Sequence, residues 1–150
     1  MNTIQLKVLD PRIGKDFSFI KYQTAGSSAI DLYAMVEKKT DIYPKEVVLL
    51  KTGIAIFIQN PFITAIILPR SGLGHYHGII LGNSIGLIDS DYQGELMVSI
   101  WNRHSKKFSI FPGDRIAQLL FVPIIKPKFQ IVNNFRKTER NTKGFGHTGI

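Results

Sequence analysis

Residues 82–96 have the sequence GNSIGLIDSDYQGEL, and their pattern predicts a β-hairpin. An apolar pair leads into a polar turn, and apolar residues return in alternation from Leu96 onward. The turn contains Asp89 and Asp91 beside Tyr92. An EF-hand calcium loop needs a twelve-residue ligand spacing and flanking helices, and this stretch has neither. It therefore predicts a hairpin that presents one reactive carboxylate and one aromatic ring, with a solvated acidic turn as the alternative.

The chain on both sides of this hairpin consists of short apolar runs. Its 22 isoleucines and six alanines favour strands over helices. Turns that contain proline or glycine separate the runs, and residues 71–78 predict one short helix. This spacing predicts a single all-β domain, a sandwich or a barrel. The predicted strands cover residues 4–8, 28–32, 47–50, 54–58, 62–68, 96–100, 116–122 and 128–132.

The composition excludes several classes of site. The 150 residues contain no cysteine, which excludes disulfides, cysteine-ligated zinc, iron–sulfur clusters and a cysteine nucleophile. The longest apolar stretch, residues 54–68, is interrupted by Gln59, Asn60 and Pro61, so it is too short for a membrane helix. The N-terminus has no basic start followed by an apolar run, and so no signal peptide is predicted. We therefore expect a soluble, cytoplasmic protein that does not bind membranes.

The net charge of +8 is concentrated in the last third of the chain. Residues 1–100 contain nine Lys or Arg and nine Asp or Glu, whereas residues 101–150 contain ten and two. From residue 133 onward the sequence is polar and basic and has no strand periodicity, which predicts a mobile arm. A local basic segment favours an arm, a rim or a flap for something anionic. Taken alone, however, such a terminus is more often a passive solvated tail.

Three further segments contain polar groups where strands are predicted. Asp31 lies in an apolar strand and must be paired, near a cation or bonded to a turn at the strand edge. Residues 69–74, PRSGLG, follow a strand and offer a guanidinium, a hydroxyl and free backbone N–H groups, which are ligands for phosphate. Gln118 lies in another apolar strand. Its amide is expected to donate either to a phosphate or across strands. For residues 69–74, taken alone, an ordinary glycine turn is the alternative.

In this order and spacing, these segments resemble the trimeric dUTPases of bacterial type. The resemblance runs from about residue 21 to residue 149 in five motifs, of which residues 86–95 are the most specific, followed by residues 69–72 and by GFGHTG at residues 144–149. It implies a jelly-roll-like β-barrel, the dUTPase-like β-clip fold, over residues 1–132. It also implies a homotrimer in which a mobile C-terminal arm, residues 133–150, closes over a neighbouring active site.

The resemblance implies a reaction as well. The enzyme would hydrolyse dUTP to dUMP and pyrophosphate with Mg²⁺, supplying dUMP for thymidylate synthesis and keeping uracil out of DNA. Asp89 would be the catalytic base that activates water for attack on the α-phosphate. Asp31 would meet the metal through a water molecule, because Mg²⁺ dehydrates reluctantly.

The remaining expected contacts with dUTP are also implied by the resemblance. They fall into four groups: phosphate binding by Arg70, Ser71, Gly72 and Gln118; uracil recognition by Asn83, Leu87, Ile88 and Met97; stacking of Tyr92 on the deoxyribose; and closure of the arm through Arg140, Phe145, Gly146, His147 and Thr148.

Two other functions are weighed against this one. A dCTP deaminase-like enzyme shares the fold but needs a longer chain and a different catalytic acid or base. A nucleic-acid-binding β-barrel places several aromatic and basic residues on one strand face. Here the basic residues cluster in the tail and Trp101 is the only tryptophan, so no nucleic-acid partner is expected.

Overall fold

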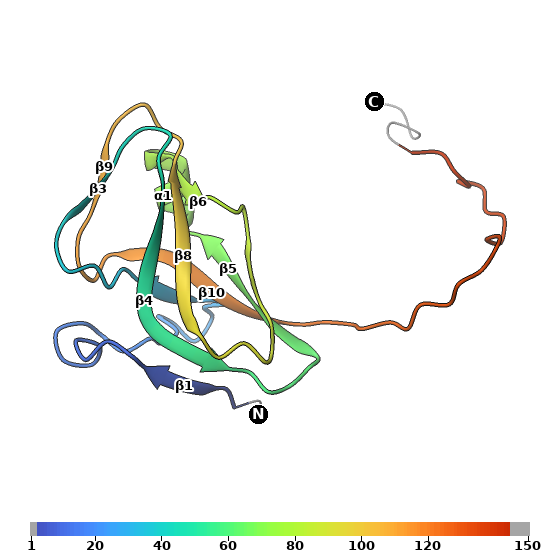
Figure 1. Ribbon diagram of the computed structural model, residues 1–150, viewed down its shortest axis with the longest axis horizontal. Helices are drawn as coiled ribbons and strands as arrows, with labels where there is room; N and C mark the ends of the chain where they lie inside the picture. The colour runs from blue at the N-terminus through green and yellow to red at the C-terminus, as the bar shows by residue number, and fades with distance from the viewer. Residues whose placement is uncertain (1–2, 145–150) are drawn as a thin grey trace.

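The structure, a computed structural model, describes residues 3–144, which form ten β-strands and one α-helix (Figure 1). The elements in chain order are β1 (Gln5–Val8), β2 (Ile30–Tyr33), β3 (Thr40–Ile42), β4 (Val47–Phe57), β5 (Ile63–Pro69), α1 (Ser71–His77), β6 (Ile79–Leu81), β7 (Gly86–Ile88), β8 (Glu95–Asn102), β9 (Phe108–Ile110) and β10 (Arg115–Pro123).

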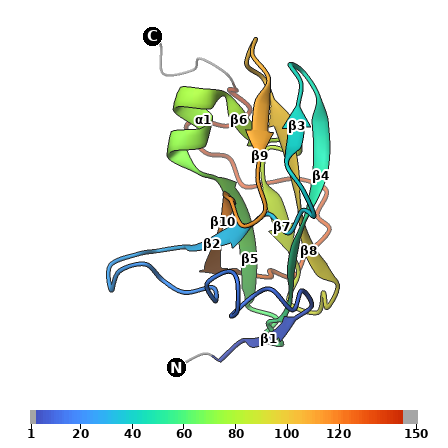
Figure 2. The ribbon, with the colours of Figure 1, turned by 90° about the vertical axis from the view of Figure 1, so that its left-hand side faces the viewer.

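Eight strands form two antiparallel four-stranded sheets, in the orders β1-β4-β8-β6 and β2-β10-β5-β7. Strands β3 and β9 pair as a separate ribbon. Side chains from both sheets and from the ribbon meet in one core, which includes Leu32, Ile67, Ile100 and Ile110. Figure 2 shows α1 and the ribbon at one end of the body and β1 at the other. The expected all-β, jelly-roll-like fold is confirmed, with two open sheets rather than one closed barrel within residues 3–144.

Strand β4 joins two runs that the sequence predicts as separate strands, residues 47–50 and 54–58. The register of its pairing with β8 shifts between Lys51 and Ala55. Gly53 lies in this interval and has a φ of 69°. A Cβ atom at this position would lie 2.6 Å from the Cβ of Asp10. Glycine therefore permits both the local bend and the close approach of the N-terminal loop.

The hairpin predicted over residues 82–96 is wrong in its pairing. Strand β7 pairs with β5 in the other sheet, with Gly86 opposite Ile67, whereas β8 pairs with β4 and β6. A Cβ at position 86 would lie 3.0 Å from the Cβ of Ile67, so glycine allows this approach. The Thr64 hydroxyl then fixes the end of β7 by donating to the Ile88 carbonyl at 2.7 Å.

The strand predicted over residues 128–132 is also wrong. After β10 the chain leaves the body, and residues 124–144 contain no strand or helix (Figure 1). Phe129 and Ile131 are 94% and 98% exposed, because no strand of this chain lies beside them in the described part. Three short strands, β3, β6 and β9, were not predicted. Within residues 3–144 no helix is long and apolar enough to cross a membrane.

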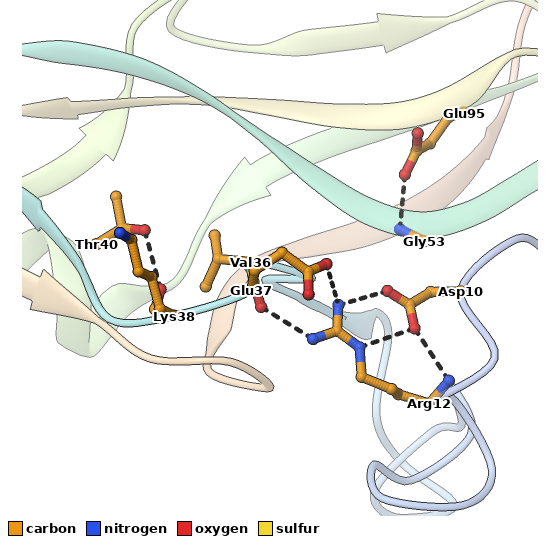
Figure 3. A network of polar contacts seen from close by, with 8 residues as sticks. All are labelled: Asp10, Arg12, Val36, Glu37, Lys38, Thr40, Gly53 and Glu95. Carbon is orange, nitrogen blue, oxygen red and sulfur yellow. Dashed lines mark hydrogen bonds and ion pairs between the residues drawn. The ribbon is translucent and has the colours of Figure 1, made fainter.

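A polar network fastens the N-terminal loop to the body (Figure 3). The Arg12 guanidinium donates to both carboxylate oxygens of Asp10, at 2.9 and 2.6 Å, and to the Val36 carbonyl at 3.1 Å. It also reaches Glu37 at 3.3 Å, and the Gly53 carbonyl accepts from the Asp10 N–H at 3.1 Å. The hydrogen bonds from Arg12 hold the pKa of Asp10 below its usual value, although partial burial opposes the shift.

Replacing Arg12 by methionine should destabilise the fold, because it removes the donors while keeping most of the apolar stem. We expect the unfolding free energy to fall by about 1–3 kcal/mol near pH 7, since the half-buried Asp10 carboxylate loses its partner. The lowered pKa of folded Asp10 means that the wild type keeps this advantage above the unfolded pKa, roughly 3.9, and loses it as pH falls further. Denaturant melts across pH, at one protein concentration, measure both effects.

Lys15→Met is the matched control, because Lys15 lies exposed on the same loop. Two results would contradict a stabilising role for the Arg12–Asp10 pair. One is a stability loss in Arg12→Met that is no larger than in this control. The other is a stability loss that stays the same between pH 7 and pH 2.

Candidate active site

Three strands bring polar side chains to one edge of the second sheet. Strand β10 lies between β2 and β5, with Gln118 opposite both Asp31 and Leu68. Strand β5 ends at Pro69 and α1 begins at Ser71, so Arg70 lies at the junction. This pairing places on one surface the polar residues that the sequence separates by up to 87 positions.

Asp31 is paired with two arginines. Its Oδ1 lies 3.1 Å from Arg70 Nε, and its Oδ2 lies 3.3 Å from Arg115 Nη1. Arg70 Nη1 also donates to the Arg115 carbonyl at 3.1 Å. The Asp31 side chain is only 14% exposed, and these contacts supply the cationic partner that a carboxylate at this position needs.

A cavity of about 310 Å³ lies in front of this ion-pair group. Its lining contains five predicted residues, Asp31, Arg70, Ser71, Gly72 and Gln118. Leu73, Tyr76 and His77 also line the cavity and were not predicted. The signal for them was available, because a helix beginning at residue 71 repeats its faces every three to four residues and carries positions 72–73 and 76–77 to one side.

Gln118 makes the cross-strand contact that was one of its two predicted roles. Its Nε2 donates to the Pro69 carbonyl at 2.9 Å, which ties β10 to the end of β5. The side-chain amide carries two N–H groups, so one remains for a ligand. At Gly72 an added Cβ would meet no atom within 4 Å, so space alone does not require glycine there.

The second group of predicted residues surrounds the turn after β7. Asp89 is exposed and follows directly after Ile88. The Tyr92 hydroxyl donates to the Glu95 carbonyl at 3.0 Å, and the Tyr92 N–H donates to the Asp89 carbonyl at 3.2 Å. The tyrosine ring leaves no room for a side chain at Gly94, where a Cβ would lie 2.6 Å from Tyr92 Cζ. The turn is therefore ordered, with its carboxylate in solvent.

The predicted uracil-reading residues lie on two sheets. Leu87 lies on β7 and is 65% exposed, and Met97 lies on β8 and is 36% exposed. Asn83 follows Gly82, whose N–H donates to the Ser99 carbonyl on β8 at 3.0 Å. The stretch between β6 and β7 thus starts beside β8 and ends beside β5.

The two groups lie at opposite ends of β5. Asp89 follows Ile88, whose carbonyl is bonded to Thr64 near the start of β5, whereas Arg70 follows the last residue of that strand. Six residues of extended chain separate Thr64 from Arg70, which corresponds to about 20 Å. One chain therefore does not bring Asp89 to the cavity that Arg70 lines.

Of the predicted arm contacts, the structure describes Arg140 alone. Arg140 is exposed, and its Nε donates to the Lys143 carbonyl at 3.1 Å. Phe145, Gly146, His147 and Thr148 lie outside the described residues. As for a metal, residues 3–144 contain no group of three or more His, Asp or Glu side chains that would bind an ion by themselves.

The comparisons with known proteins agree with the fold and the motifs. The dUTPase family model matches residues 15–149. The deoxyuridine 5'-triphosphate nucleotidohydrolase of Buchnera aphidicola subsp. Schizaphis graminum is 60% identical and covers 99% of this chain and 95% of its own length. The enzyme of the same name from Actinobacillus pleuropneumoniae serotype 5b is 56% identical, with 99% of both chains covered.

Solved structures extend the comparison. A mutant dUTPase of Staphylococcus bacteriophage 80alpha with dUpNHpp is 25% identical and has a TM-score of 0.84 over all of both chains. A mutant dUTPase from phage phi11 of S. aureus, described with a structural Mg(II) ion, has a TM-score of 0.77 at 21% identity over 91% of this chain and all of its own. The second likeness is one of fold only. Because the family model covers most of the sequence and the bacterial relatives match along its length, the chain belongs to the dUTPase family of deoxyuridine 5'-triphosphate nucleotidohydrolases.

Proposed function

We propose that this enzyme hydrolyses dUTP to dUMP and pyrophosphate with Mg²⁺, by attack of an Asp89-activated water on the α-phosphate. The observation that carries the proposal is the convergence of Arg70, Ser71 and Gln118 on one cavity. The reaction would take place in the cytoplasm, supply dUMP for thymidylate synthesis and keep uracil out of DNA.

The cavity suits a triphosphate. Arg70 donates one Nη1 N–H to the Arg115 carbonyl and its Nε faces Asp31 in an ion pair, so the other Nη1 N–H and both Nη2 N–H groups remain for phosphate oxygens. Ser71 adds a hydroxyl and Gln118 its second amide N–H. Uracil would be recognised by Asn83 and by residues 87, 88 and 97, with mismatched bases rejected because their polar groups stay unpaired. Tyr92 would stack on the deoxyribose.

The donor set in the cavity fits a Mg²⁺ ion that is held mostly by substrate. Asp31 is the acidic residue in the lining, and although both of its oxygens contact arginines, a carboxylate has further lone pairs that accept from water. Magnesium commonly keeps its waters and binds through one or two carboxylates and phosphates. When bound, the ion would neutralise phosphate charge and align the α-phosphate.

We further propose that the active site is shared between subunits of a homotrimer. The Asp89 turn and Arg70 lie at opposite ends of β5, which are about 20 Å apart, so one chain holds its own Asp89 away from its phosphate-binding cavity. A neighbouring copy that brings its Asp89 turn to this cavity would complete the site. This arrangement also gives the arm, residues 133–150, a place over a neighbouring site, where Arg140 and residues 145–148 would contact the nucleotide.

Turnover of a nucleotide panel tests the reaction. With dUTP, dCTP, dTTP and UTP in the presence of Mg²⁺, we expect pyrophosphate from dUTP alone. Asp89→Asn should bind dUTP but lose roughly 10²–10⁴ in turnover, as removal of a general base does. Asp91→Asn, two residues away in the same turn, is the matched control and should stay active. Release of ammonia from dCTP would instead identify a deaminase, and a fully active Asp89→Asn would rule out this base.

Mixed oligomers test whether the site is shared. Asp89→Asn and Arg70→Ala subunits, refolded together, should regain activity that neither has alone, because some sites then combine an intact Asp89 with an intact Arg70. As the control, Arg70→Ala mixed with Gln118→Ala should show no gain, since both residues line one cavity of the same chain. A mixture of the first pair that is no more active than its components would exclude sharing.

Truncation tests the arm. Deleting residues 137–150 should leave the melting temperature and the oligomeric state unchanged, because the described part of this segment is exposed and contacts little of the body. Turnover of dUTP should fall sharply, whereas removing Ile150 alone should have no effect. Kinetics equal to those of the full chain would restore the passive-tail alternative.

A further inference from the structure

Arg115 belongs to the ion-pair group behind the cavity, although it does not line the cavity itself. Among the described residues, the lining includes Arg70 and Asp31 but not Arg115. Arg115 nevertheless contacts both of them, through its side chain to Asp31 at 3.3 Å and through its carbonyl to Arg70 at 3.1 Å. From this position Arg115 can act on a ligand through these two neighbours.

An irregularity in β10 gives Arg115 this orientation. In a regular strand, side chains alternate between faces, so Arg115 would share a face with Ala117 and Leu119, which are both completely buried. The pairing of β10 with β2 shifts register between Arg115 and Ala117. The extra residue, Ile116, is only 2% exposed, so two consecutive side chains face the core.

The consequence of this bulge is a change of face. With Ile116 and Ala117 both turned inward, Arg115 comes to the side that carries Gln118 and Asp31. β-Bulges commonly redirect a side chain next to functional sites. Here the redirected group is a second guanidinium, which reaches the free oxygen of a carboxylate that already holds Arg70.

These contacts immobilise Arg70 at two points. The Nε of Arg70 lies 3.1 Å from Asp31 Oδ1 in an ion pair, and its Nη1 donates to the Arg115 carbonyl. The Asp31 carboxylate is in turn held by the Arg115 side chain, and the carbonyl belongs to the Arg115 backbone. The remaining three donors of Arg70 then have a fixed direction before any ligand arrives. A long side chain that is already ordered loses less conformational entropy on binding, so fixing it raises affinity for an oxyanion.

We infer that Arg115 is a positioning residue of the phosphate-binding cavity, which holds Asp31 so that Asp31 in turn presents the guanidinium of Arg70 to a phosphate chain. The inference deepens the proposed function and rests on it for the identity of the nucleotide. It concerns the cavity of a single chain, and it gives Asp31 a task that requires no metal.

Calorimetric titration with inorganic tripolyphosphate in metal-free buffer tests the inference on the full-length protein. Arg115→Ala should bind about tenfold more weakly than the wild type, the size expected when a charge-assisted contact that orders the site is lost. Arg115→Lys should recover part of the affinity, because its ammonium group can still pair with Asp31. The KM for dUTP should follow the same order, with a smaller effect on kcat.

The sign of the Asp31→Asn effect separates positioning from simple electrostatics. Removing a negative charge from the cavity would tighten anion binding if charge alone mattered. Positioning predicts weaker binding instead, and it predicts that Asp31→Asn/Arg115→Ala binds no more weakly than Asp31→Asn, since the two residues act in series. Without metal in the buffer, loss of a metal ligand cannot explain the result.

Arg103→Ala is the matched control, because Arg103 is exposed in the loop after β8 and its loss changes the net charge equally. Arg115→Ala binding as tightly as this control, tighter binding by Asp31→Asn, or additive effects in the double variant would each overturn the inference. If the wild type does not hydrolyse dUTP, the proposed function fails, whereas the tripolyphosphate series still decides the role of Arg115.

Discussion

The antiparallel pairing of β10 with both β2 and β5 is the constraint on which the cavity depends. Backbone hydrogen bonds place Gln118 between Asp31 and Leu68, and the core fixes this register. Leu32 and Leu119, on the opposite face, are completely buried. A slip by one residue would turn buried leucines toward the cavity and the polar side chains into the core, which is energetically prohibitive.

Strand β5 connects the cavity to the rest of the proposed active site. One end leads into Arg70 and α1, and the other lies beside β7 and the turn that contains Asp89. Because its centre is buried, with Ala65 and Ile67 almost inaccessible, β5 acts as a rigid spacer. The separation of the two residue groups is therefore a property of the core, and movement of a surface loop would not remove it.

The sequence predicted elements well where the information was local. Long apolar runs located β4, β5, β8 and β10, and the glycine- and serine-containing stretch after Pro69 located α1. The polar residues at 31, 70 and 118 were also identified, because each is out of place in an apolar strand or follows one. Their convergence on one cavity could be expected only from the family resemblance, since strand pairing is not encoded in any one segment.

The errors have non-local causes. Residues 86–88 pair with β5 rather than β8, because contact with Ile67 and Thr64 outweighs closeness in sequence. The bulge at Ile116 breaks the alternation from which a face is predicted, so the orientation of Arg115 could not be inferred from periodicity. The strands β3, β6 and β9 have three residues each, too few for any period to be recognised.

The strand predicted at 128–132 failed for a different reason, which bears on the proposed assembly. Ile125, Phe129 and Ile131 alternate with Lys126, Lys128 and Gln130, a pattern of period two, yet these apolar side chains are 91–98% exposed. A strand needs a partner for its backbone groups, and none of the described strands of the same chain is beside this segment. Covering such side chains would gain roughly 25 cal/mol for each Å² of apolar surface removed from water. The proposed homotrimer would offer both a neighbour for this segment and an Asp89 for the cavity, so one assembly would account for two features that a single chain leaves incomplete.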